Sequence, residues 1–206
     1  MEVKLLAITH FLHGDGSTEG LIEYAGRVCY RTQPRGNPGA FIRKRIEEGH
    51  ESIIEHAVAT FEIRGISRAC SHQLVRHRLA SYSQESQRYV DMNHPEFVLP
   101  PSIAQNPEAM RVWEETLKAV QTGYRKLREL GIHKEDARFL LPNATATRIV
   151  MSANFREWRH FLKVRLNPKA QWEIRELARR ILIILYRVAP SVFADIAQEA
   201  GVTGKE

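Results

Sequence analysis

The chain has 206 residues, 43% hydrophobic and 26% charged, as expected of a globular protein with one substantial core. Its net charge of +6 favours an anionic partner, either nucleic acid or a phosphorylated small molecule. Two cysteines without a CxxC pair exclude a disulfide framework and argue against a cysteine zinc site. The sequence shows no apolar run of membrane-spanning length and no signal-peptide pattern, so we expect a cytoplasmic protein.

The N-terminal part alternates between short strands and helices. The apolar run Val3–Ile8 predicts a buried strand. Apolar residues follow helical spacing over about Thr18–Tyr30, and again over Ala40–Gly49. Glycine commonly ends helices, so Gly49 marks the end of the second one. Between these helices, Thr32–Gly39 is rich in glycine and proline and predicts a loop. The alternating, β-branched run Ala57–Ile66 predicts the next strand.

A short helix should follow that strand and extend through Val75. Ser67 is suited to cap it. Ile66, Cys70 and Leu74 are spaced by four and give the helix one apolar stripe. We therefore interpret Cys70 as a small hydrophobic core residue rather than a nucleophile.

The clearest helix lies in the middle of the chain. Large apolar and aromatic side chains recur there at 4-3-4-3 spacing, at Trp113, Leu117, Val120, Tyr124 and Leu127. Gly131 marks the end of this helix. The periodicity predicts a long amphipathic helix.

Short elements return after the long helix. A helix should begin near Lys134 and stop before Pro142, because proline disfavours helical geometry in the residue that precedes it. The β-branched run Thr145–Ala153 predicts a strand. A helix is then expected from about Asn154 to Arg165.

Two further helices complete the prediction. We expect a helix over residues 171–189 that is amphipathic in its first part and buried in its later part, and Pro190 should end it. Ser191 is a suitable cap for a last helix ending at Gly201. Many helices, few strands and no linker predict an α+β fold, in which residues 1–206 form a single domain with a mixed, mainly antiparallel sheet packed by helices.

The spacing of the histidines argues against a metal centre. His50 and His56 are six residues apart, whereas a helical metalloprotease pair needs a spacing of four. Six residues turn a helix by roughly 600°, which leaves two side chains about 120° apart. His72 and His77, five apart, also diverge. We therefore expect no metal.

The segment Arg76–Tyr89, RHRLASYSQESQRY, concentrates hydrogen-bonding side chains. Ser86 could be a hydrolase nucleophile, but its neighbours are Glu85 and Gln87 and no GxSxG turn surrounds it. A serine among polar residues is more often a hydrogen-bonding or loop residue. We therefore favour a non-nucleophilic role for Ser86.

Three arginines of this segment suit a phosphorylated ligand. Arg76, Arg78 and Arg88 lie among serines and glutamines. Arginine holds phosphate through a bidentate fork, and several together neutralise a dianion. A solvated face would more often mix lysine with glutamate, and a nucleic-acid patch would interleave lysine, glycine and aromatics. We favour a ligand pocket, with a solvated face as the alternative.

A second group of polar residues lies on the predicted helix near the C-terminus. Asn154 and Arg165 are eleven residues apart and share one helix face, about three turns apart. Arg156 and His160 are an i, i+4 pair on an adjacent strip. A basic solvated helix face accounts for these residues equally well, and the pattern alone does not decide between the two interpretations.

Several segments together resemble the flavin-dependent thymidylate synthases. Arg76-His77-Arg78, seven residues and then Ser86 resembles the signature of that family, and SQRY extends the match. GHESIIEH, DARFLLP, NFREWRHFLKVR and AQWEI are similar to other family segments and occur in the family order, over about residues 49–174.

The resemblance implies an enzyme that methylates dUMP to dTMP. Methylenetetrahydrofolate would supply the carbon, and FAD reduced by NADPH would deliver the hydride. It also implies a homotetramer with active sites at subunit junctions. No short motif marks the folate and NADPH sites. The alternative is a basic, non-catalytic module that binds nucleotides or nucleic acid, which would have no need of Arg138 or of the segment Asn154–Arg165.

The resemblance also implies roles for individual residues. The FAD-binding positions are Ser52, Arg76, His77, Arg78, Gln84, Asn154, Phe155, Arg156 and His160. The dUMP-binding positions are Gln73, Leu74, Val75, Arg76, Gln84, Glu85, Ser86, Gln87, Arg88, Arg138 and Arg165. Arg165 would activate the pyrimidine near N3, and Ser86 would polarise or hold dUMP without a covalent bond.

Overall fold

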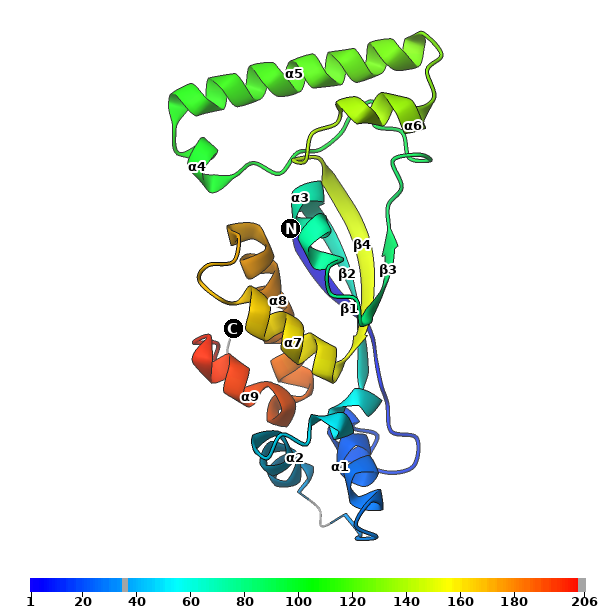
Figure 1. Ribbon diagram of the computed structural model, residues 1–206, viewed down its shortest axis with the longest axis vertical. Coiled ribbons are helices and arrows are strands. Elements are labelled where there is room, and N and C mark those ends of the chain that lie inside the picture. Colours follow the sequence, from blue (N-terminus) through cyan, green and yellow to red (C-terminus); the bar gives the residue numbers. More distant parts are fainter. Residues whose placement is uncertain (35–36, 204–206) are drawn as a thin grey trace. The chain divides into compact units, whose positions relative to one another are not determined.

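Four strands in the computed structural model form one antiparallel sheet (Figure 1). The structure describes residues 1–34 and 37–203. The strands are β1 (Glu2–Ile8), β2 (Val58–Ser67), β3 (Ala80–Gln84) and β4 (Ala146–Asn154). Their order in the sheet is β1-β2-β4-β3. Helices outnumber the strands, and the predicted α+β fold is confirmed.

The register of the sheet is fixed where strands begin and end. Thr9 N–H donates to Val58 O at 2.9 Å, and Phe155 N–H donates to Ala57 O at 2.8 Å.

The first strand, β1, was predicted to be buried, and this part of the prediction is wrong. Because β1 lies at an edge of the sheet, part of it stays open to solvent, and Leu6 is 47% exposed.

The described residues fall into two compact units. The first, which we call the α5 unit, comprises Met1–Glu2, Ile63–Gln73 and Ser83–Ile149. The second, the α7 unit, comprises Val3–Glu62, Leu74–Tyr82 and the chain from Val150 onward. Each of the strands β1, β2, β3 and β4 has residues in both units.

The α7 unit holds most of the helices. They are α1 (Thr18–Val28), α2 (Pro38–Glu47), the 3₁₀ helix η1 (Glu51–His56), α7 (Phe155–Arg165), α8 (Trp172–Val188) and α9 (Pro190–Glu199). α7 packs against η1, α8 and α9, and α2 packs against α1 and α9. Their apolar faces together build the core of this unit.

α7 is anchored to β2 by one tryptophan. Trp158 is fully buried, and its indole N–H donates to Ala59 O at 3.1 Å. The ring also contacts Phe61 and Phe161 edge-on, with centroids 5.1 and 5.7 Å apart. A buried indole with its polar atom satisfied fixes the rotation of α7, so that the side chains on its opposite face are presented outward.

The α5 unit is built around the long helix. It contains α4 (Pro101–Ala104), α5 (Pro107–Glu129), α6 (Lys134–Ala137) and the 3₁₀ helix η2 (Arg138–Leu140), and α3 (Arg68–Leu74) begins in it. Asn106 caps α5 by accepting from Glu108 N–H, and Gly131 ends it with φ of +82°. Tyr124 is fully buried and its hydroxyl accepts from Met92 N–H. The predicted long helix is confirmed.

Two of the predicted helix caps have different outcomes. Ser67 caps α3 as expected, because its Oγ accepts from Cys70 N–H at 3.0 Å. Ser191 was predicted to cap the last helix and does not. Pro190 already occupies the first helical position of α9, so Ser191 lies inside the helix and donates its N–H to Glu19 Oε1.

The predicted loop Thr32–Gly39 is only partly described, because positions 35–36 lie outside the described residues. Asn37 caps α2 and Pro38 begins it, so the loop ends one or two residues earlier than expected.

Across residues 1–34 and 37–203, no helix has both the length and the apolar character needed to cross a membrane.

Candidate functional site

A cavity of about 870 Å³ opens in the α7 unit. Its walls come from η1, from the loop after α3 and from α7. Six of the predicted flavin-binding residues line it: Arg76, His77, Arg78, Asn154, Arg156 and His160. The structure therefore brings together two sequence segments that lie about seventy-five positions apart.

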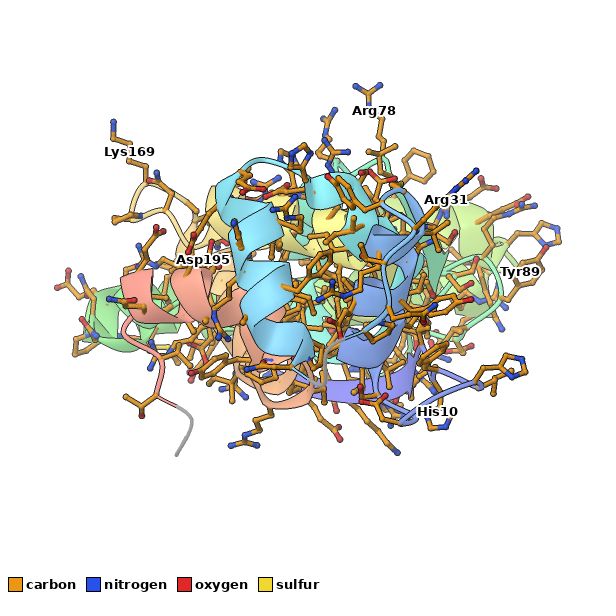
Figure 2. The ribbon with its side chains drawn as sticks, turned by 90° about the horizontal axis from the view of Figure 1, so that it is seen from below. His10, Arg31, Arg78, Tyr89, Lys169 and Asp195 are labelled. Carbon is orange, nitrogen blue, oxygen red and sulfur yellow. The ribbon has the colours of Figure 1, made fainter. Side chains whose placement is uncertain are left out.

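The loop Arg76–Leu79 is held by a tyrosine of β3. Tyr82 Oη lies 2.9 Å from Leu74 O and 2.7 Å from His77 O. Burial, together with nearby Glu157, raises the pKa of Tyr82 to about 12, so the phenol remains a donor at neutral pH. The Arg78 side chain is exposed and extends away from the ribbon (Figure 2).

His77 is the buried residue of this loop. Only 4% of it is exposed, and Arg165 Nε donates to its Nε2 at 3.0 Å. The His77 ring also meets His160 and Phe161 edge-on, with centroids 5.6 and 5.1 Å away. Burial, followed by the nearby charges of Arg165 and His160, lowers the pKa of His77 to about 4. His77 is therefore neutral at pH 7.

The helix α7 positions the opposite wall. Asn154 caps it, because its Oδ1 accepts from Glu157 N–H at 2.9 Å. Arg159 is almost fully buried and makes two hydrogen bonds of 2.7 Å to Asp195. These anchors turn Arg156 and His160 towards the cavity, and Arg156 pairs with Glu55 of η1 at 2.5 Å.

Two predicted flavin residues of the α7 unit do not line the cavity. Ser52 is exposed on η1, and Phe155 is fully buried against Phe193, with ring centroids 5.2 Å apart. The Phe155 side chain is therefore part of the core, and a contact from this residue to a flavin would have to come from its main chain. The assignments of both residues stay predictions.

One cluster has the composition of a metal site. Nitrogen or oxygen atoms of His77, Glu157 and His160 lie within 4.8 Å of one another. However, Arg165 can only donate, so His77 Nε2 must accept and the single proton of the neutral ring is on Nδ1. The imidazole then presents an N–H to the cluster rather than the lone pair that a metal needs. The arrangement favours a hydrogen-bonded row over a metal centre.

The α5 unit holds most of the predicted dUMP residues. Gln84 donates its amide to Ser71 Oγ at 2.9 Å and to Thr147 Oγ1 at 3.2 Å. Ser86 Oγ accepts from Arg88 N–H at 3.2 Å, which is the contact of a turn residue. Its contacts within the described part of the chain do not include a histidine base.

Cationic groups gather beside this turn. A cavity of about 300 Å³ is lined by Arg88, Tyr89, Arg128, His133, Lys134 and Glu135. Arg88 pairs with Glu135 at 2.9 Å, and the Nε of Arg138 donates to the main-chain oxygen of Glu135 at 3.0 Å. The structure therefore brings Arg88 and Arg138 to the same residue, Glu135, and their assignment to the nucleotide stays a prediction.

Sequence reasoning missed several residues of these sites. Glu157 and Arg159 are buried in the wall of the larger cavity, although their positions in NFREWRHF look like those of surface charges. Arg68 was also missed. Its guanidinium lies 3.5 Å from Glu85 O, and its burial and the charge of Arg138 lower its pKa. A charged residue at a core position of the helical pattern is the signal that could have identified Arg159.

Comparison with known proteins finds similarity to thymidylate synthases. Residues 12–191 match the model of the Thy1 family, described as "Thymidylate synthase complementing protein". A flavin-dependent thymidylate synthase of Mycolicibacterium gilvum is 39% identical, over 100% of this chain and 94% of the relative. That of Geobacter sulfurreducens is 44% identical over 86% of this chain and 81% of its own length. The flavin-dependent thymidylate synthase of Thermococcus kodakarensis is 54% identical over 65% of this chain and 56% of its own length.

The family match covers both segments that line the larger cavity and the turn that carries Ser86. Identity of 39% extends over 100% of this chain and 94% of the Mycolicibacterium gilvum relative. On these grounds, the chain belongs to the flavin-dependent thymidylate synthase family.

Proposed function

We propose that this chain converts dUMP to dTMP by reductive methylation. Methylenetetrahydrofolate is the carbon donor, and FAD reduced by NADPH is the hydride donor. The observation that carries the proposal is the pairing of Arg165 with neutral His77 at the wall of the cavity that six predicted flavin residues line. Relatives named flavin-dependent thymidylate synthases support the same reaction.

The cavity fits a flavin nucleotide in size and charge. Its volume of about 870 Å³ lies in the range of small-molecule sites, roughly 300–1,000 Å³. Its cationic side chains, among them Arg76, Arg78, Arg156 and Lys163, suit a diphosphate. Arg76, Arg78 and Arg156 would hold the charged part of the cofactor. Bound flavin supplies the hydride chemistry.

Arg165 acts on the pyrimidine by charge. A methylene group can add to uracil only when C5 is electron-rich. A guanidinium beside the N3–O edge stabilises negative charge there and so raises the nucleophilicity of C5. A guanidinium has donors and no acceptor, so Arg165 acts by charge and not as a general base. His77 accepts a hydrogen bond from Nε of Arg165, and this contact limits the rotation of the guanidinium.

Ser86 holds or polarises dUMP without forming a bond to it. Its hydroxyl belongs to a turn stabilised by Arg88 N–H, and Arg88 and Arg138 would contact the charged part of the nucleotide. Gln73, Gln84, Glu85 and Gln87 would provide further polar contacts from the α5 unit. The roles of Leu74 and Val75 stay predictions, and because their side chains are apolar, any polar contact from them would come from the main chain. The alternative function, a non-catalytic nucleotide- or nucleic-acid-binding module, has no use for the Arg165–His77 pair.

We also propose that residues 1–206 act as one domain, because a single family model matches residues 12–191. Self-association as a homotetramer with shared active sites and a cytoplasmic location remain predictions. Light scattering coupled to size-exclusion chromatography tests the tetramer, and a dimer or monomer would contradict it.

The first test is whether the purified protein binds FAD. We expect a yellow protein, or one that regains flavin absorbance when FAD is added and excess cofactor is removed. The flavin should then be reduced by NADPH. A chain that neither retains nor rebinds FAD would support the non-catalytic alternative and overturn the proposed function.

A further inference from the structure

Three side chains form a row in the α7 unit, and the assigned reaction uses only two of them. Arg165 Nε donates to His77 Nε2 at 3.0 Å, and on the other side of the ring His77 Nδ1 lies 3.3 Å from Glu157 Oε1. His77 and Glu157 are only 4% and 5% exposed. Glu157 therefore lies behind the histidine, on the opposite side from the arginine.

The proton on the imidazole follows from this row. Arginine has no acceptor, so Arg165 must be the donor to Nε2. A neutral imidazole has one N–H, which is then on Nδ1 of His77. The carboxylate of Glu157 can accept from that N–H, and its Oε1 lies 3.3 Å from Nδ1, slightly beyond the usual hydrogen-bond range of about 2.7–3.2 Å. Nδ1 makes no closer hydrogen bond within the described ranges, so a small rotation of Glu157 would complete the row.

Glu157 has no evident structural task that would explain its burial. The start of α7 is capped through its main-chain N–H and not through its carboxylate. The helix is anchored by Trp158 and Arg159. Burial raises the pKa of the Glu157 carboxyl, as expected where a charge is desolvated without a close ion-pair partner. Keeping a carboxylate there costs stability, which points to a role in the site.

The geometry points to Glu157 as a positioning residue that holds the Nδ1–H form of His77 and, through it, the orientation of the Arg165 guanidinium. Carboxylates fix the orientation and tautomer of histidines in many active sites in this way. The inference rests on the proposed function, because Arg165 acts on the pyrimidine in that proposal. In this role Glu157 acts through His77 and contacts no reacting atom.

The central test compares Glu157→Gln with a matched control. Glutamine keeps the size of the side chain and removes its charge. We expect kcat for dTMP formation to fall about tenfold, while the dissociation constant of FAD, measured by flavin fluorescence, changes less than about twofold. The control is Glu23→Gln, which neutralises another buried carboxylate of the α7 unit, paired with Arg27 at 2.8 Å. It should leave kcat unchanged.

A double-mutant cycle shows whether Glu157 acts through His77. In a His77→Leu background the side chain can neither accept from Arg165 nor donate to Glu157, so the link between these two residues is cut. Glu157→Gln should then change kcat by less than about twofold. An equal, tenfold loss in both backgrounds would overturn the inference. Glu157→Asp, which keeps the charge but withdraws it by one methylene, should fall between the wild type and Glu157→Gln.

A measurement on the flavin-free protein separates this inference from the proposed function. Nitrogen-15 NMR of the imidazole distinguishes the two neutral tautomers. Wild-type protein at pH 7 should show His77 protonated at Nδ1 and unprotonated at Nε2, whatever reaction the chain catalyses. An Nε2–H tautomer would overturn the inference even if dTMP is formed. Absence of dTMP formation by the wild type, with the Nδ1–H form present, would instead count against the proposed function.

Discussion

Acid should destabilise this protein through His77. The imidazole is 4% exposed, and burial, with Arg165 and His160 nearby, lowers its pKa from 6.5 to about 4. A base whose pKa is depressed by folding contributes stability that is present above pH 6.5. That stability is lost as the pH falls towards 4, because the His77 imidazole binds a proton in the unfolded chain but remains neutral in the folded chain. The perturbation is therefore a change from pH 7 to pH 5.

The size of the effect follows from the two pKa values. Between pH 6.5 and 4 the unfolded state binds about one more proton at this position, and each pH unit is then worth about 1.4 kcal/mol. At pH 5 the loss attributable to His77 is about 2 kcal/mol relative to pH 7. This is a substantial part of the roughly 5–15 kcal/mol by which domains are stable.

The assay compares urea unfolding of the wild type and His77→Gln at both pH values. Glutamine does not titrate, so we expect the wild type to lose about 2 kcal/mol more of its free energy of unfolding between pH 7 and 5. Glu157 has a raised pKa and its effect has the opposite sign, since its contribution is lost as the pH rises. Because Glu157 lies against His77, the comparison is repeated in a Glu157→Gln background, in which this carboxyl no longer titrates. Equal pH dependence of the two proteins, or an NMR pKa near 6.5 for His77, would refute the reasoning.

Three other predictions concern single side chains. Arg165→Ala should lower dTMP formation at least about 100-fold, because it removes a charge that acts in the transition state, and should leave FAD binding within about twofold; normal turnover would remove Arg165 from the mechanism. Ser86→Ala should weaken activity, and mass spectrometry of the wild type during turnover should show no Ser86–nucleotide adduct, whose appearance would contradict a non-covalent role. Trp158→Ala should lower the free energy of unfolding by about 3–5 kcal/mol in urea, because it empties a fully buried site and leaves Ala59 O without its donor; a loss below about 1 kcal/mol would show that this contact does not anchor α7.

Hydrophobic periodicity was sufficient to predict most of the fold. The long helix, the strand before Ser67 and the helix before Pro190 were all predicted, because their apolar residues repeat at the helical or strand period. β3 was missed, because ASYSQ has no large or β-branched aliphatic residue, and its partly buried positions are Ala80, Tyr82 and Gln84. Its strand geometry comes from pairing with β4, which is a tertiary effect.

The candidate site was only partly predictable, for a related reason. The resemblance to the family identified Arg76, His77 and Arg165, and the structure shows the last two in contact. It did not identify Glu157, because a glutamate near the start of a helix ordinarily faces solvent and stabilises the helix end. Its burial depends on how α7 packs, and no local pattern reports that. The opposite error was made for Ser191, where a favourable cap residue was displaced by the proline before it.

The most direct test of the account is a single assay of the purified, FAD-loaded chain. It combines dUMP, methylenetetrahydrofolate and NADPH, and measures dTMP by chromatography and mass. We predict dTMP that depends on all three compounds and on Arg165, together with oxidation of NADPH. A fully flavin-loaded protein that forms no dTMP under these conditions would contradict the account.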